Sequence, residues 1–206
     1  DHVQPPTDAE HAALAALPLD LERIMAELGL SRLDEPRERS FYERLAGWPT
    51  FTINGLHGGY GGPESKTVLP HEAFAKCDMR LVANQTVADA FALVEAHVRR
   101  FAPEVEVVFQ GGMDPSKTPL DSPYAAPIQA AIREAQGVEP LIVPALGGSL
   151  PDYVWTRTLG VPSFVVPYAN HDEANHAPNE NIEVERFFAG IKTGAAILVN
   201  LGELAK

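Results

Sequence analysis

Apolar residues follow a helical rhythm at the start of this chain, and the rhythm changes near residue 48. Up to that point the spacing predicts three short helices separated by breaks. The first begins at Thr7-Asp8-Ala9-Glu10, which has the spacing of a capping box. Asp20 can cap the second helix, and the third covers Phe41 to Ala46. Residues 1–48 are therefore interpreted as a helical connector.

Between residues 49 and 115 the pattern mixes strand-like and helical stretches. The predicted elements are strands at 50–53, 73–82 and 105–109 and a helix at 86–100. A glycine-rich stretch at 55–63 predicts a turn between the first two strands. The order strand, strand, helix, strand predicts an α+β unit, with an antiparallel sheet that carries a helix on one face.

From residue 116 onward helices alternate with short apolar runs. The predicted helices cover 123–136, 152–159 and 183–204, and the predicted strands cover 140–144 and 163–166. Helices that alternate with short buried strands are typical of an α/β layer of the parallel type. The fold class is thus α+β followed by α/β, with the second boundary near residue 115.

Composition narrows the class of function. The chain has 206 residues, 45% of them hydrophobic and 21% charged, which is typical of a globular protein. A formal net charge of -12 disfavours nucleic-acid and anionic membrane partners. The lone Cys77 excludes an intrachain disulfide and fits a reducing cytoplasm, although it also fits an exported protein without disulfides. The first residue is Asp1, so we expect the sequence to begin within a longer protein.

Two glycine-containing stretches resemble known functional motifs, a phosphate loop and a nucleophile elbow, but each lacks a residue that the motif requires. Ser65 stands where a phosphate loop needs glycine before its lysine, so nucleotide binding is rejected. In Gly147 to Pro151 a proline follows Ser149 at the distance where a nucleophile elbow has glycine, which disfavours a serine nucleophile. Ser149 can instead cap a helix, or the turn can bind an anion.

Two further features leave structural and functional readings open. Polar, titratable residues fill His171 to Asn181, directly after an apolar run, and imidazole and carboxylate groups are zinc ligands. This stretch is either a metal site or a polar loop with capping residues. Arg80 lies in a predicted strand, where it is either an ion-paired surface residue or a bidentate clamp on a carboxylate.

Taken together, several blocks resemble the M20 metallopeptidase family, most closely its dipeptidase branch. The blocks are Pro49-Thr50 to Gly55, Gly59-Tyr60-x-Gly62-x-x-Ser65-Lys66-Thr67-Val68-x-Pro70, Ala75-Lys76 with Met79-Arg80-Leu81-Val82, Gly147-Gly148-Ser149-Leu150-Pro151, and Asn175-His176-Ala177-Pro178-Asn179-Glu180. No single block is specific, but their combination and order are.

The resemblance implies an enzyme whose catalytic α/β domain binds two zinc ions or other divalent metals. It also implies a lid domain with a four-stranded antiparallel sheet that mediates homodimerisation. On this reading residues 49–115 are the later part of the lid, and residues 116–206 are the closing part of the catalytic domain. Metal-activated water would attack the scissile carbonyl, a glutamate would transfer its proton, and closure of the lid would complete the site.

Four residues match functional positions of the family. His176 matches its last metal-binding histidine, Arg80 the arginine that grips the substrate carboxylate, and Gly148 with Ser149 the turn that contacts substrate. His57 and His171 match no role that can be carried over. An early His-x-Asp motif, a Glu-Glu pair that includes the general base, and a further carboxylate ligand have no counterpart in this sequence.

We therefore expect part of a cytoplasmic zinc peptidase that acts on dipeptides or short peptides with a free C-terminal carboxylate. Because the base and most metal ligands lack counterparts, the isolated chain is expected to be inactive. Two alternatives remain: a deacylase of N-acyl amino acids in the same family, and a non-catalytic dimerisation or assembly module.

Overall fold

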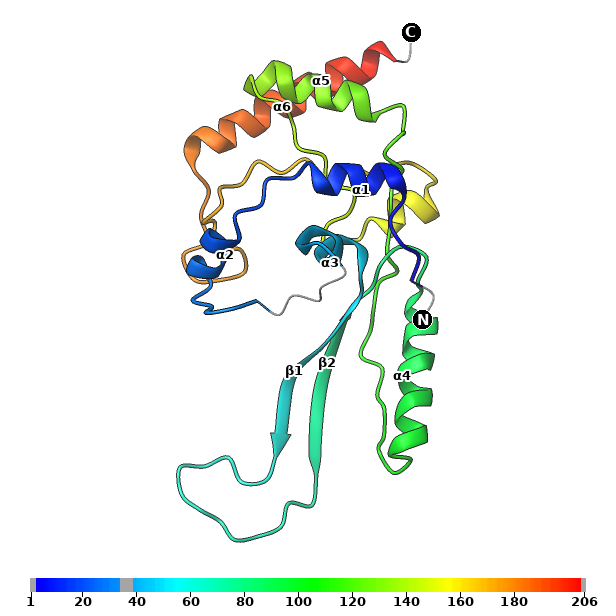
Figure 1. Cartoon of the computed structure of the whole chain (residues 1–206), viewed down its shortest axis with the longest axis vertical. Helices are drawn as coiled ribbons and strands as arrows, with labels where there is room; N and C mark the ends of the chain where they lie inside the picture. Colours follow the sequence, from blue (N-terminus) through cyan, green and yellow to red (C-terminus); the bar gives the residue numbers. More distant parts are fainter. Residues whose placement is uncertain (1–2, 34–38, 205–206) are drawn as a thin grey trace.

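A computed structural model describes residues 3–33 and 39–204 of the chain, and Asp1 lies outside these ranges. The elements are α1 (Asp8–Ala15), α2 (Leu21–Glu27), α3 (Phe41–Gly47), β1 (Thr50–Gly58), β2 (Ala73–Arg80), α4 (Val87–Phe101), α5 (Ala125–Gln136), η1 (Val154–Thr158) and α6 (Val184–Glu203). The β1–β2 hairpin extends away from the short helices, and α5 and α6 lie together at the opposite end (Figure 1). The mixed α and β class predicted from the sequence is confirmed.

Side-chain caps define where the first helices begin, as the sequence predicts. Thr7 and Glu10 form a complete capping box on α1, in which each side chain accepts a backbone N–H of the other residue. Asp20 accepts the Arg23 N–H at 3.0 Å and caps α2. These local hydrogen bonds satisfy backbone donors that the first turn of a helix leaves unpaired.

The strand β1 is longer than its sequence predicts. It pairs antiparallel with β2 and continues through the glycine-rich stretch as far as Gly58, which pairs with Ala73. The prediction of a turn from residue 55 is therefore wrong for its first residues. The register shifts between Ile53 and Gly55, so Asn54 forms a bulge that allows the strand to continue. A side chain at Gly55 would meet Lys76, because an added Cβ would lie 3.3 Å from the Lys76 Cβ.

Three predicted strands do not form in the described part of the chain. The stretches 105–109, 140–144 and 163–166 have no regular secondary structure, and none pairs with a strand there. A strand needs a partner for its backbone hydrogen bonds, and propensity alone cannot supply one. The helix predicted at 152–159 is also different, because the structure has a short π-helix, η1, at its centre.

Helix α4 packs against the segment that follows it, and α5 packs against α6. The helix α4 begins at Thr86, which accepts the Asp89 N–H at 3.1 Å, and its Phe91 ring packs 5.1 Å from the ring of Phe109 in the returning segment. The buried apolar side chains among the described residues are Leu14, Ala90, Ile128 and Ala131. No helix in 3–33 or 39–204 has the length and apolar character to cross a bilayer.

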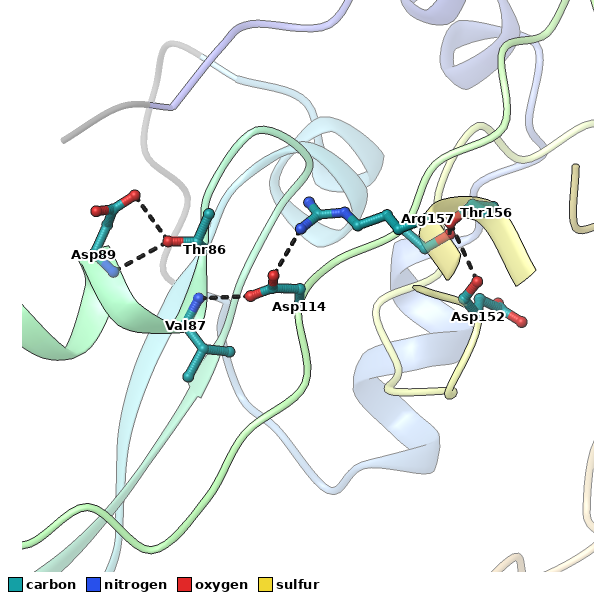
Figure 2. Close-up of polar contacts among 8 residues, drawn as sticks. Thr86, Val87, Asp89, Asp114, Asp152, Thr156 and Arg157 are labelled. Atoms are coloured by element: carbon teal, nitrogen blue, oxygen red, sulfur yellow. Dashed lines mark hydrogen bonds and ion pairs between the residues drawn. The ribbon is translucent and has the colours of Figure 1, made fainter. Parts of the chain in front are cut away.

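A short stretch, Asp114–Thr118, bonds to four other parts of the chain, and we call it the crossing segment. Asp114 accepts the Val87 N–H at 2.8 Å and pairs with Arg157 at 2.6 Å (Figure 2). The carboxylate thus joins the first turn of α4 to η1, and a negative charge is favourable at that end of a helix. The remaining bonds are Ser116 to Thr156 (2.8 Å), Lys117 to Glu10, and Thr118 to Ser163 (2.8 and 3.0 Å).

Glu10 is the most buried carboxylate in these contacts, at 5% exposure. Burial raises the pKa of Glu10, but hydrogen bonds from Lys117 and Thr7 favour the carboxylate and bring the pKa below its ordinary value. A carboxyl group whose pKa is lowered by folding stabilises the folded state above its unfolded pKa. That stabilisation is lost as the pH falls through the lowered folded pKa.

We expect Glu10→Gln to lower the free energy of unfolding at pH 7 by about 1–3 kcal/mol, because it removes the charged partner of Lys117. Asp8→Asn is the matched control, since it removes one charge from the same helical turn at an exposed position. Urea denaturation measures both variants. The deficit of Glu10→Gln should shrink as the pH falls below about 4.3, the ordinary pKa of glutamate. Equal effects of the two variants would contradict this role of Glu10.

Candidate functional site

The structure brings two of the predicted site residues into direct contact. Arg80, the last residue of β2, donates from Nη1 to the Ser149 Oγ at 2.6 Å, although the two residues are 69 positions apart. Its Nε lies 3.1 Å from the Asp78 Oδ2 on the same strand. Polar partners therefore hold the guanidinium on two sides. Because Arg80 is exposed, the group also meets solvent.

Gly148 and Ser149 also lie on the wall of a cavity of about 510 Å³. Its other walls include residues of α1, α5, the crossing segment, and the stretches 140–146 and 163–167. Neither Arg80 nor His176 lines this cavity. The predicted substrate-binding residues therefore meet at its edge, and His176 lies elsewhere.

His176 is exposed in the loop between Asn170 and Glu183, which we call the His176 loop. Its backbone has a φ of 60°, and Ala174 and Asn179 are left-handed as well, at 54° and 66°. Left-handed conformations are unfavourable for residues with a Cβ, although asparagine tolerates them better than most. Within the described residues the His176 side chain makes no hydrogen bond or ion pair.

Two hydrogen bonds of Asn170 influence the start and end of this loop. Its carboxamide donates to the Asp172 Oδ1 at 2.8 Å and accepts the Glu183 N–H at 3.0 Å. The hydrogen bond from Asn170 is the main reason why the pKa of Asp172 lies below its ordinary value, and the backbone N–H of Asp172 adds to the shift. The carboxylate form of Asp172 is thus favoured beside a buried amide.

The two histidines without an assigned role have structural surroundings. His171 lies 3.6 Å from the Glu27 carboxylate, which connects the His176 loop to the end of α2. The His57 ring stacks on Phe74 across the hairpin, with centroids 5.2 Å apart.

A metal centre does not fit the described residues by themselves. No group of three or more histidine, cysteine, aspartate or glutamate side chains in 3–33 and 39–204 is placed to hold a metal ion. A catalytic zinc site takes three protein ligands and a water molecule. His176 can therefore be at most one member of a metal site whose other ligands come from outside these residues.

The sequence analysis did not identify several residues that shape the site. Asp78 lies two positions before Arg80, where alternation along a strand places both side chains on one face. This spacing could have identified it as the partner of Arg80. Asn170 stands directly after an apolar run, at the start of the polar stretch. Asp114 and Arg157 are 43 positions apart, and no local pattern pairs them.

Comparisons with known proteins were made on the sequence and on the fold. A family model described as the peptidase dimerisation domain of M20 proteins matches residues 9–106. Human Beta-Ala-His dipeptidase is 25% identical over 211 residues, which cover 99% of this chain and 41% of that protein. The Cys-Gly metallodipeptidase of Saccharomyces cerevisiae is 25% identical over 211 residues, which cover 95% of this chain and 42% of that protein. The chain thus spans less than half the length of these curated relatives.

A solved structure agrees over nearly the whole chain. The M20 family metallo-carboxypeptidase of Sulfolobus solfataricus superposes with a TM-score of 0.88 and 29% sequence identity. The match covers 96% of this chain and 46% of the carboxypeptidase. Motif order, fold and relatives therefore agree: residues 9–106 match the M20 peptidase dimerisation domain, and the chain as a whole is similar to M20 metallopeptidases.

Proposed function

We propose that this chain supplies the carboxylate-binding and dimer-forming parts of a cytoplasmic zinc metallopeptidase. Its substrates are dipeptides or short peptides with a free C-terminal carboxylate. The observation that carries the proposal is the 2.6 Å hydrogen bond between Arg80 and Ser149. This contact places a cation and a hydroxyl group side by side, at the edge of a cavity.

The surroundings of Arg80 suit a carboxylate. A guanidinium can present two parallel N–H donors to the two oxygens of one carboxylate. Asp78 engages Nε and orients the group, and the hydrogen bond to Ser149 engages Nη1. The Ser149 hydroxyl accepts from Arg80 and can donate its own proton to the same ligand. An incoming carboxylate would thus find one cation and one neutral donor.

The comparisons support peptides as the substrate class. The relatives named above are two dipeptidases and a carboxypeptidase, and the match to a dimerisation domain supports a homodimer. None of these observations favours N-acyl amino acids, so deacylation is not pursued as a second function. The exposed, unpaired Cys77 is in keeping with a reducing compartment.

In this proposal the chain does not catalyse hydrolysis by itself. His176 is its one candidate metal ligand, and Arg80, Gly148 and Ser149 bind the substrate. The described residues provide no three-ligand metal site. The division of the chain into a connector at 1–48, a lid region at 49–115 and a catalytic region at 116–206 belongs to the same proposal.

We expect the purified chain to contain much less than one zinc ion per molecule and to release no amino acids from Cys-Gly or β-Ala-His. Metal content is measured by mass spectrometry and hydrolysis by amino-acid analysis. A chimera, in which this chain replaces the matching part of the yeast relative, should hydrolyse Cys-Gly, and His176→Ala in that chimera should abolish the reaction. Hydrolysis by the chain alone, or an active His176→Ala chimera, would count against the proposal.

A second prediction concerns the free carboxylate of the substrate. In the chimera, Arg80→Lys should raise KM for a dipeptide about tenfold. Lysine keeps the positive charge but cannot offer two parallel N–H donors to the carboxylate, and hydrogen bonds to charged groups contribute about 1.5–3 kcal/mol. The same dipeptide with a C-terminal amide has no carboxylate for Arg80 to bind. It should therefore bind equally poorly to the chimera and to its Arg80→Lys variant.

The matched control for this prediction is Arg99→Lys, which makes the same substitution at an exposed residue of α4 paired with Glu95. Its KM should remain unchanged. If Arg80→Lys and Arg99→Lys behave alike, Arg80 does not bind the carboxylate.

A further inference from the structure

One buried amide closes the His176 loop. Asn170 is 5% exposed, and its carboxamide uses both of its N–H groups and its oxygen. Nδ2 donates to the Asp172 Oδ1 at 2.8 Å and to the Asn181 Oδ1 at 3.0 Å, and Oδ1 accepts the Glu183 N–H at 3.0 Å. A single side chain therefore bonds to residues near both ends of the loop that carries His176.

Asn181 extends this closure inward. Its Nδ2 donates to the backbone oxygens of Asp172 at 3.4 Å and Asn179 at 3.0 Å, and its N–H donates to the Glu173 oxygen at 2.9 Å. The Asn181 Oδ1 is the acceptor for Asn170, so the orientation of one amide fixes that of the other. The two residues form a continuous hydrogen-bonded base below the loop.

The conformation of the loop requires such a base. Ala174, His176 and Asn179 are all left-handed, with φ between 54° and 66°. A residue with a Cβ stays in this region only when its surroundings hold it there. His176 itself is exposed, and its side chain makes no hydrogen bond or ion pair within the described residues, so its direction depends on the backbone of the loop.

We propose that Asn170 is a positioning residue, whose two donated hydrogen bonds hold the His176 loop in its left-handed form and thereby fix the direction of the His176 imidazole. The inference rests on the proposed function in that it takes His176 as a member of the site. It assigns to Asn170 a role that acts through the loop, without contact with substrate.

A simpler role for Asn170 is to start helix α6, because its oxygen accepts the N–H of the capping residue Glu183. The two roles use different atoms of the carboxamide. Asn170→Asp separates them, since a carboxylate keeps the acceptor for Glu183 but donates nothing to Asp172 or Asn181. It also places a second negative charge beside Asp172. The positioning role predicts that this variant loosens the loop and leaves the start of α6 intact.

The test is amide hydrogen exchange, measured by NMR on the 206-residue chain, together with the ring ¹H–¹⁵N spectrum of His176. In Asn170→Asp we expect exchange of the Asn181 N–H to become at least about tenfold faster, while that of Glu183 and the α6 amides is unchanged. The His176 ring signals should shift. Asn175→Asp is the matched control, because it makes the same substitution in the same loop at an exposed side chain without a hydrogen bond in the described residues.

A double variant, Asn170→Asp with Asp172→Asn, exchanges donor and acceptor between the two positions. It restores the hydrogen bond between positions 170 and 172 but not the one to the Asn181 Oδ1, so we expect part of the lost protection of Asn181 to return and the His176 ring signals to move back part of the way. Three results would overturn the proposal: equal effects of Asn170→Asp and Asn175→Asp, no recovery in the double variant, or loss of protection throughout α5 and α6. The measurement needs no substrate or metal, so a failure of the proposed peptidase function would be seen separately.

Discussion

The crossing segment Asp114–Thr118 is the constraint on which the arrangement of this chain depends. Its polar side chains bond to α4, α1, η1 and Ser163, which belong to four separate stretches of sequence. Few side chains are fully buried among the described residues, so these directed hydrogen bonds carry much of the relative placement of the elements. Directed bonds fix orientation more narrowly than non-directional apolar contact does.

The candidate site inherits its geometry from that arrangement. Arg80 lies at the end of the hairpin, and Ser149 lies in the stretch before η1. Asp114 joins the start of α4, a few residues after Arg80, to Arg157 in η1, a few residues after Ser149. The contacts of Asp114 thus join the same two regions as the hydrogen bond between Arg80 and Ser149. Two independent connections hold the same two regions of the molecule together.

The His176 loop is held by hydrogen bonds of its own, apart from the crossing segment. It places an exposed histidine on left-handed backbone, above a buried amide that bonds to both ends of the loop. Preorganisation of this kind is what a ligand position needs when its partners come from outside the loop. Under the proposed function, the chain contributes binding groups and not a complete catalytic site.

Local chemistry in the sequence was sufficient for the helices and the family. The Thr7–Glu10 capping box, the Asp20 cap and the amphipathic spacing predicted α1 to α6 close to their observed bounds, because helical hydrogen bonds and caps lie within a few residues of each other. The ordered motif blocks also indicated the M20 family and selected Arg80, Ser149 and His176.

Strands and long-range contacts were decided only by the tertiary structure. The apolar stretches 105–109, 140–144 and 163–166 have strand composition, yet strand formation depends on a partner that composition does not reveal. The bulge at Asn54 and the pairing of Arg80 with Ser149 across 69 positions likewise depend on neighbours distant in sequence. The sequence determined which groups are present and where helices begin, and folding alone determined which groups meet, because their partners are distant along the chain.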